Sequence, residues 1–211
     1  MSDKHKAYDL ALRDKNMYPT IAYGSAGTGK TYGAVRAAYE ALSAKKFQQI
    51  IVTRPNVSFA EKSGFLPGNE REKADPWIRP ILQTMDAFCP RSLTMKWEQE
   101  GKLVFYPLEY IQGMTFDKSF IIVDEAQNIT FDQLKVLLTR TGKYSKLVLC
   151  GDVAQISPKF QGSGLAQLLK MVNHFDMPVH TIEFTREDIL RSPQCKLWIT
   201  AFEDYEVLRN V

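Results

Sequence analysis

The sequence predicts an α/β fold in which helices cover both faces of a mostly parallel central sheet. Three observations support this prediction. Short apolar segments alternate with amphipathic ones along nearly the whole chain, and a glycine-rich loop joins the first apolar segment to an alanine-rich one. In addition, two acids, Asp124 and Glu125, directly follow the most apolar segment. Because parallel strands end at a common edge, ligand-binding groups are expected to gather there.

Six segments are expected to form strands, because each is short and rich in apolar or β-branched residues. They span residues 20–23, 47–53, 102–106, 119–123, 146–150 and 179–184. The segment Ser-Phe-Ile-Ile-Val at 119–123 is the most apolar of them. This composition predicts a central strand that is buried on both faces.

Helices are expected between most of these strands, where apolar residues recur at helical spacing. They span residues 34–42, about 75–88, 130–142, 164–173 and 193–207. Thr130 and Gln133 have the spacing of a capping box, and Gly142 is typical of a helix end. Ser192-Pro193 is typical of a helix start.

Residues 54–100 have little strand character and are expected to form an inserted segment. Two interpretations stay open: a lid or cover over part of the sheet, or a contact with nucleic acid or another subunit. The second interpretation draws on Lys62, Phe65, Arg71, Lys73, Trp77 and Arg79. A segment of mixed charge does not decide between them.

The run Gly24-Ser25-Ala26-Gly27-Thr28-Gly29-Lys30-Thr31 is a complete G-x-x-x-x-G-K-[ST] loop (Walker A) between a strand and a helix. All eight residues are expected to bind a nucleoside triphosphate. The glycines let successive N–H groups point inward, and the helix N-terminus adds partial positive charge. Lys30 is expected to reach the β- and γ-phosphates, and the Thr31 hydroxyl is expected to ligate Mg²⁺.

Three further residues are expected at the same edge of the sheet. Asp124 would hold Mg²⁺ through a water, together with Thr31. Glu125 would orient and deprotonate the attacking water, which favours hydrolysis over a passive nucleotide switch. Gln155, in the segment Gly-Asp-Val-Ala-Gln after the next strand, would lie near the γ-phosphate. A helix N-cap and an ordinary turn are the structural alternatives for the acidic pair and for Gln155.

Length and composition predict a single domain over residues 1–211, with a core at about 18–205. The net charge of +3 permits a nucleic-acid partner without requiring one. Three separated cysteines without a C-x-x-C pair indicate a reducing compartment, and the three histidines have no metal-binding spacing. No apolar run approaches the roughly 20 residues of a membrane span. A soluble, cytoplasmic protein with no membrane partner is therefore expected.

The ordered motifs resemble the first RecA-like domain of superfamily 1 helicases and, more narrowly, the PhoH-like family of P-loop ATPases. Besides the phosphate loop, they are Arg54-Pro55, Gly64 to Gly68, Asp124 to Asn128, Leu138 to Gly142 and Gly151 to Gln155. The resemblance covers residues of about 20 to 205. It implies a three-layer P-loop NTPase (RecA-like) fold, with ATP and Mg²⁺ as cofactors. In place of the family's Arg-Gly-Arg-Thr, this chain has Gln112-Gly113-Met114-Thr115, so two arginines are absent.

Helicases of that superfamily complete their ATP site with an arginine from a second RecA-like domain, and only one such domain fits here. The resemblance therefore implies a homo-oligomer, a hexameric ring, in which a neighbouring subunit supplies this arginine finger. Arg191 is the first candidate, because the family has an arginine at the matching position; Arg186 and Arg140 are the alternatives.

Some residues keep two interpretations. Arg54 would contact a nucleic-acid backbone or another subunit, or would cap its own loop. Tyr8 and Tyr18 would stack on a base or pack in the interior.

The leading hypothesis is a Mg²⁺-dependent ATPase whose activity is coupled to single-stranded RNA or DNA. The alternative is a nucleotide-gated binding or assembly protein with little turnover. Glu125 and Gln155 favour the first, and the missing arginines at positions 112 and 114 favour the second. A nucleoside kinase is disfavoured, because the Asp-Glu-Ala-Gln box indicates water as the acceptor. Nothing in the sequence establishes helicase activity.

Overall fold

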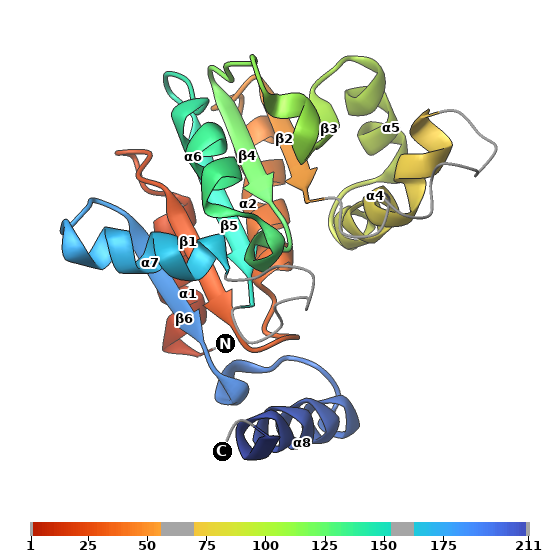
Figure 1. Ribbon diagram of the computed structural model, residues 1–211. Helices are drawn as coiled ribbons and strands as arrows, with labels where there is room; N and C mark the ends of the chain where they lie inside the picture. The colour runs from red at the N-terminus through yellow and green to blue at the C-terminus, as the bar shows by residue number, and fades with distance from the viewer. Residues whose placement is uncertain (1, 56–69, 153–162, 210–211) are drawn as a thin grey trace.

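The computed structural model describes residues 2–55, 70–152 and 163–209. This part of the chain forms one six-stranded sheet in the order β3-β2-β4-β5-β1-β6 (Figure 1). The strands are β1 (Thr20–Gly24), β2 (Gln49–Arg54), β3 (Leu103–Pro107), β4 (Ser119–Val123), β5 (Lys146–Gly151) and β6 (His180–Phe184). All neighbouring strands are parallel, so their carboxyl ends meet at one edge. The predicted fold class is confirmed.

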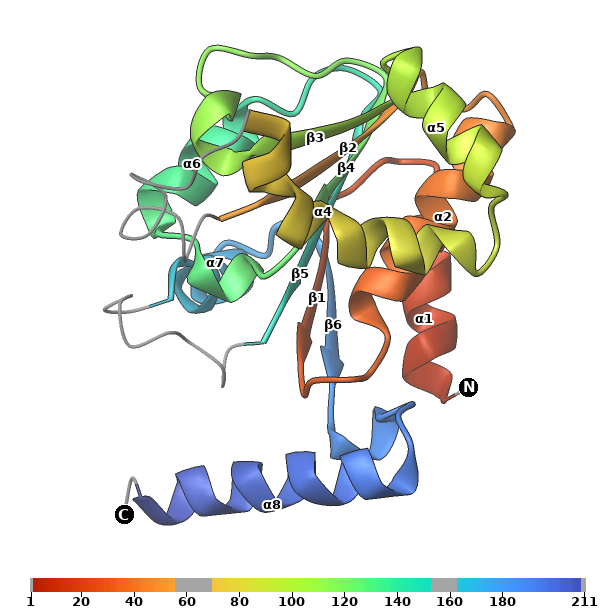
Figure 2. The ribbon, with the colours of Figure 1, turned by 90° about the vertical axis from the view of Figure 1, so that its right-hand side faces the viewer.

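Helices form a layer on each face of the sheet (Figure 2). One face is covered by α1 (Asp3–Leu12), α2 (Lys30–Ser43), α4 (Glu70–Asp86) and α5 (Arg91–Gln99). The other is covered by α6 (Phe131–Thr139) and α7 (Gly164–His174). The helix α8 (Pro193–Arg209) lies apart, beyond the carboxyl ends of the strands. Short 3-10 helices are η2 (Leu108–Ile111), η3 (Ala126–Asn128) and η4 (Arg186–Asp188).

The side chains of strand β4 alternate between two hydrophobic cores, one on each face of the sheet. Phe120 and Ile122 pack under α2, whereas Ile121 and Val123 face α6 and α7. All four side chains are buried, as expected for a parallel strand between two neighbours. The predicted central position of this strand is therefore confirmed. A rigid β4 holds Asp124 and Glu125, which follow it, at a fixed place on the carboxyl edge.

The segment between β2 and β3 forms a crossover on the α2 face, in the part that is described. Ile81, Leu82 and Met85 of α4 and Trp97 of α5 are buried in the core of that face. These contacts support the interpretation of this segment as a cover over the sheet. Lys62 and Phe65, named for the alternative, lie outside the described residues, and so do the side chains of Arg71, Lys73 and Trp77.

Two helices were not predicted. In α1, only His5, Tyr8, Ala11 and Leu12 are buried, and the remaining positions are largely charged, so the apolar pattern is weak. In α5, Thr94 and Trp97 are the buried positions. No helix in the described ranges is both long and apolar enough to cross a membrane.

Lys146 is a fully buried lysine at the amino end of β5. Its Nζ donates to the carbonyl oxygens of Ala11 (2.7 Å) and Tyr18 (2.5 Å). Burial lowers the pKa of Lys146 from 10.5 to about 8. As the pH rises, Lys146 therefore loses its proton at a lower pH in the folded state than in the unfolded state. The free energy of unfolding consequently rises with pH between these two pKa values.

We expect the free energy of unfolding of the wild type to rise by about 2 kcal/mol between about pH 7 and pH 10, relative to that of Lys146→Met. Urea unfolding at several pH values measures this difference. Lys135→Met, which changes an exposed lysine of α6, is the matched control and should keep the wild-type slope. Equal pH slopes for the wild type and Lys146→Met would contradict the expectation.

Candidate nucleotide-binding site

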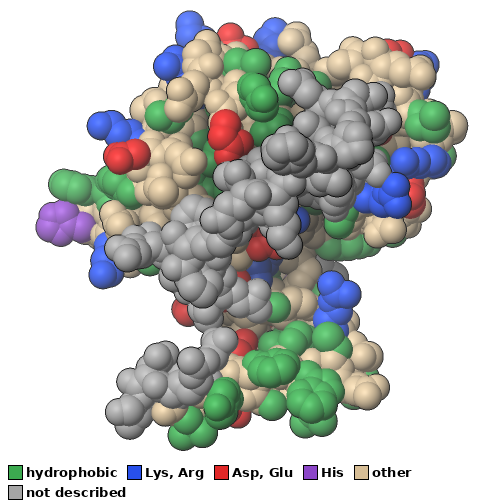
Figure 3. Space-filling model, turned by 45° about the vertical axis from the view of Figure 1, so that its right-hand side comes forward, with side chains coloured by type: hydrophobic (Ala, Val, Ile, Leu, Met, Phe, Trp, Pro, Cys, Tyr) green, Lys and Arg blue, Asp and Glu red, His purple; other side chains and the backbone are tan. Residues whose placement is uncertain are grey.

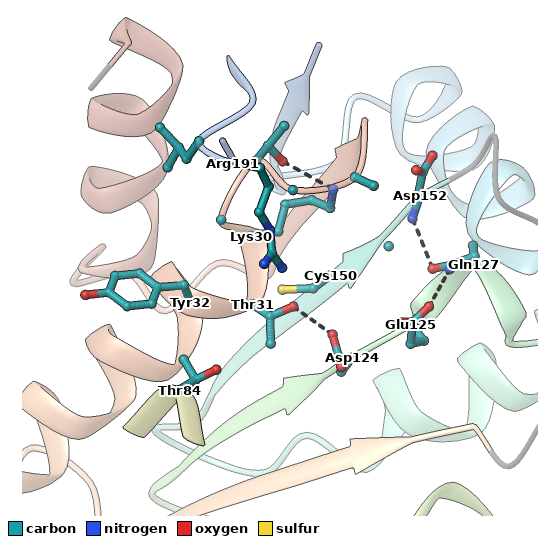
Figure 4. Close-up of a pocket in the computed structure, with 16 residues that line it drawn as sticks. Lys30, Thr31, Tyr32, Thr84, Asp124, Glu125, Gln127, Cys150, Asp152 and Arg191 are labelled. Carbon is teal, nitrogen blue, oxygen red and sulfur yellow. Dashed lines mark hydrogen bonds between the residues drawn. The ribbon is translucent and has the colours of Figure 1, made fainter. Parts of the chain in front are cut away.

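A cavity of about 610 Å³ opens at the carboxyl edge of the sheet (Figure 4). Its size is within the range of small-molecule sites. The phosphate loop forms one wall, and the ends of β4 and β5 form the opposite wall. The lining residues are Ala26 to Tyr32, Thr84, Asp124, Glu125, Gln127, Cys150, Gly151, Asp152, Leu190 and Arg191. Most of the residues predicted to bind nucleotide and metal therefore share one cavity.

Two glycines of the loop are required by its shape. Gly24 has a φ of 106°, and a Cβ there would collide with the carbonyl group of Phe184. Gly27 has a φ of 72°, and a Cβ there would lie 2.7 Å from Cγ of Arg191. Glycine adopts this left-handed region without strain, whereas other residues do not. The loop can consequently curl tightly and lie against the chain that follows β6.

Lys30 folds back over the loop. Its Nζ donates to the carbonyl oxygens of Gly24 and Ser25, both at 2.7 Å, and to Oγ1 of Thr28 at 3.3 Å. Desolvation lowers the pKa of Lys30, and the nearby carboxylate of Asp152 opposes this shift. An ammonium group that is partly desolvated and surrounded by loop carbonyls is well placed to receive an anionic oxygen.

The loop is supported from behind by α1, the helix that the sequence analysis missed. The carbonyl oxygen of Thr28 is hydrogen-bonded to Nε2 of His5 at 2.9 Å, and the hydroxyl of Tyr8 donates to the carbonyl oxygen of Lys30 at 2.9 Å. On the side of β6, the backbone N–H of Leu190 donates to the carbonyl oxygen of Gly27. Tyr8 therefore packs in the interior, which was one of its two interpretations.

Thr31 and Asp124, the two residues expected to hold Mg²⁺, lie side by side. The Thr31 hydroxyl donates to Oδ1 of Asp124 at 2.7 Å. Burial raises the pKa of Asp124, and the neighbouring Glu125 carboxylate raises it further. A cation beside this carboxylate would offset the electrostatic cost of keeping it ionised.

These donors fit Mg²⁺, which prefers hard oxygen ligands and keeps several of its waters. Across residues 2–55, 70–152 and 163–209, no group of three or more acidic, histidine or cysteine side chains forms a metal cage. A magnesium ion at Thr31 and Asp124 would therefore also need water and phosphate oxygens as ligands.

Glu125 has a left-handed backbone, with a φ of 53° and a ψ of 39°. Such a conformation is uncommon outside glycine and often marks a functional position. Its Oε2 accepts a hydrogen bond from Nε2 of Gln127 at 2.7 Å, and its Oε1 lies 3.4 Å from Nη2 of Arg54. Oε1 of Gln127 in turn accepts from the N–H of Asp152 at 3.0 Å. Two neighbouring strand ends thus fix the position of the Glu125 carboxylate.

Sequence reasoning assigned no role to Gln127, although it lies in the Asp-Glu-Ala-Gln box. The residue is only 3% exposed, so its amide is held inside the site. The signal that the sequence offered for Gln127 was an amide side chain within three positions of the carboxylates of Asp124 and Glu125. Gln155, which was expected near the γ-phosphate, lies outside the described residues.

Tyr32 and Thr84 form the outer side of the cavity, and neither was predicted. Tyr32 follows the phosphate loop directly and is 44% exposed, with its ring edge-to-face against Phe88. Thr84 comes from α4. Cys150 lies deeper, and burial raises the pKa of its thiol to about 12, so it stays protonated and is a poor nucleophile.

Arg191 lines the cavity of its own chain, and Figure 4 shows its guanidinium reaching toward Thr31 and Tyr32. Arg191 thus lies at its own site in this single chain, and the expectation that it serves the site of a neighbouring subunit stays a prediction. Arg186 instead forms ion pairs with Glu203 (3.6 Å) and Asp204 (2.9 Å) of α8. Arg140 lies at the opposite edge of the sheet, where its carbonyl oxygen accepts from Phe116, ahead of β4.

Comparisons with known proteins show which family this chain resembles in sequence. A family model described as "PhoH-like protein" matches residues 1–203. The PhoH-like protein of Bacillus subtilis is 41% identical over 199 residues, which cover 94% of this chain and 61% of that protein. This chain therefore spans about three-fifths of the length of that relative.

Solved structures share the fold at low sequence identity. The large terminase of a thermophilic bacteriophage, in complex with ADP, superposes with a TM-score of 0.53 at 14% identity, over 92% of this chain and 48% of that one. The Sulfolobus solfataricus SWI2/SNF2 ATPase core, in complex with dsDNA, superposes with a TM-score of 0.51 at 14% identity, over 87% of this chain and 44% of that one. These likenesses support a P-loop ATPase fold.

Proposed function

This chain belongs to the PhoH-like protein family, and from this premise we propose that it binds ATP with Mg²⁺ and hydrolyses it. One observation carries the proposal. The cavity that contains the phosphate loop is also lined by the carboxylates of Asp124, Glu125 and Asp152, and of the two that follow β4, Asp124 is hydrogen-bonded to Thr31 whereas Glu125 is bonded to Gln127. A site that only binds a nucleotide needs Asp124 to hold the metal ion and does not need Glu125 as a base.

The binding half of the proposal rests on the loop. Its N–H groups and the N-terminus of α2 would hold the phosphates, and Lys30 would exchange its loop carbonyls for β- and γ-phosphate oxygens. Thr31 and Asp124 would hold Mg²⁺, which neutralises charge that develops on the phosphates.

The hydrolytic half rests on Glu125. Its carboxylate would accept a proton from the attacking water, and Gln127 would fix its orientation. Arg191, which lies beside the phosphate loop, would offset negative charge on the γ-phosphate. Gln155 remains a candidate for a contact with the γ-phosphate.

We expect Tyr32→Ala to weaken the binding of ATP by about tenfold, because an exposed ring beside the phosphate loop offers a stacking surface to the base. Titration of a fluorescent ATP analogue measures the dissociation constant. Tyr110→Ala removes an exposed ring outside the cavity and is the matched control. An unchanged constant for Tyr32→Ala would place the base elsewhere.

We further propose self-association, as a ring of six subunits, and activation by single-stranded RNA or DNA. Support for self-association comes from α8, where Figure 3 shows apolar side chains gathered at the base of the molecule. Among the described side chains of α8, the large apolar ones that are exposed are Leu197, Trp198, Phe202, Tyr205 and Leu208. A surface of this kind is typical of an interaction site. Sedimentation equilibrium, with and without ATP, measures the number of subunits.

A second candidate function is a nucleotide-gated binding protein with little turnover. One observation favours it: Arg54 lies close to both Asp124 (3.8 Å) and Glu125 (3.4 Å), so the carboxylate proposed as the base is partly neutralised. The two functions differ in turnover and share ATP binding.

Phosphate release from ATP tests the proposal, measured with Mg²⁺ or with EDTA, and with or without single-stranded RNA or DNA. Turnover that needs Mg²⁺ supports the ATPase, and a higher rate with RNA or DNA supports the coupling. Tight ATP binding with negligible turnover in every condition would reject the ATPase and support the nucleotide-gated alternative.

A further inference from the structure

Arg54 approaches the two carboxylates from outside the cavity. It ends β2, which lies on the far side of β4 from the phosphate loop. It is not among the described residues that line the cavity. Its Nη2 is 3.4 Å from Oε1 of Glu125, and its Nη1 is 3.8 Å from Oδ2 of Asp124. Arg54 therefore lies beside the two acids and outside the lining of the cavity.

The two oxygens of the Glu125 carboxylate face different partners. One oxygen accepts from Gln127, and the other faces the guanidinium of Arg54. A general base must take a proton from water with one of these oxygens. The guanidinium of Arg54, 3.4 Å from Oε1, occupies space beside the oxygen that a water molecule would have to reach.

We propose that Arg54 is a positioning residue that restrains Glu125 and keeps the basal rate of hydrolysis low. This inference rests on the proposed function, in which Glu125 is the base. The side chains of Arg54 and Glu125 are 32% and 35% exposed, so the pair is only partly shielded from water. Pairs of this kind are weak enough to separate without unfolding the site. Separation leaves Glu125 held by its hydrogen bond from Gln127, with Oε1 available to the attacking water.

The test compares steady-state hydrolysis by the wild type, Arg54→Ala and Arg54→Lys. We expect Arg54→Ala to raise kcat by about fivefold, the effect of a partly exposed ion pair, and to leave KM for ATP within about twofold. Arg54→Lys retains a cation and should stay close to the wild type. Arg36→Ala, which removes an exposed arginine that pairs with Glu40 on α2, is the matched control and should change neither constant. Arg54→Met keeps the apolar stem and serves if Arg54→Ala does not fold; the same rise in kcat is expected.

A fall or no change in kcat for Arg54→Ala and Arg54→Met would overturn the inference, and so would an effect confined to KM. The double variant Arg54→Ala/Glu125→Gln adds a check on the route of action. If Arg54 acts through Glu125, the double variant hydrolyses ATP no faster than Glu125→Gln does; a fivefold gain in that background would overturn the inference. If the wild type hydrolyses ATP and Arg54→Ala shows no rise in kcat, only the proposed restraint of Glu125 by Arg54 is rejected. No turnover in any protein, with ATP binding intact, rejects the proposed hydrolysis itself.

Discussion

Glu125→Gln is expected to lower kcat for ATP hydrolysis by about 10²- to 10⁴-fold, which is the usual contribution of a general base. Glutamine keeps the size of the side chain and an oxygen that can accept from Gln127. It does not take up a proton from water, so the loss should appear in the chemical step. The dissociation constant for ATP should change little, because Lys30, Thr31 and Asp124 remain in place.

Single-turnover phosphate release and equilibrium binding separate these two quantities. Glu109→Gln, which changes an exposed carboxylate of η2, is the matched control and should leave both unchanged. If Glu125→Gln kept the wild-type rate, Glu125 would not be the base. If it lost ATP binding instead, the substitution would have damaged the phosphate site.

The parts of the site that the sequence predicted are those determined by short, local patterns. The loop from Gly24 to Thr31 carries its own geometry, since its glycines adopt the required left-handed conformations. The apolar strand before Asp124 determines both its burial and its place on the edge of the sheet. The capping box at Thr130 likewise formed as predicted, because it involves residues three positions apart.

The parts that the sequence did not predict depend on contacts between distant segments. The side of α1 that packs under the loop shows no strong apolar pattern, and its roles come from single bonds such as that of His5 to Thr28. Tyr32 looks like one more residue of a helix until the fold places α4 beside it. Arg191 reaches its own phosphate loop because Leu190 bonds to Gly27, more than 160 positions away along the chain. A pattern search that considers neighbouring residues does not detect such pairings.

Because Arg191 lines the nucleotide cavity, its substitution is expected to have the second large effect on the rate of hydrolysis. Arg191→Ala is expected to lower kcat by about 10³-fold or more, the usual contribution of an arginine that faces the γ-phosphate during transfer. Arg186→Ala is the matched control, because its guanidinium pairs with Glu203 and Asp204 and does not line the cavity. Its rate should stay within about threefold of the wild type. A rate for Arg191→Ala that equals the wild-type rate would remove Arg191 from the catalytic groups.

Mixing two inactive proteins distinguishes an arginine that serves its own chain from one that serves a neighbour. In a mixture of Glu125→Gln and Arg191→Ala subunits, each chain lacks one of the two groups. Because the Arg191 side chain lies in the cavity of its own chain, no site in such a mixture contains both groups, and activity should stay at the level of either variant. If Arg191 acted across a subunit boundary, a site could combine Glu125 of one chain with Arg191 of the next, and mixing would restore hydrolysis. Recovery of activity would therefore show that Arg191 acts in the site of a neighbouring subunit during turnover. It would also show that catalysis requires assembly of the subunits.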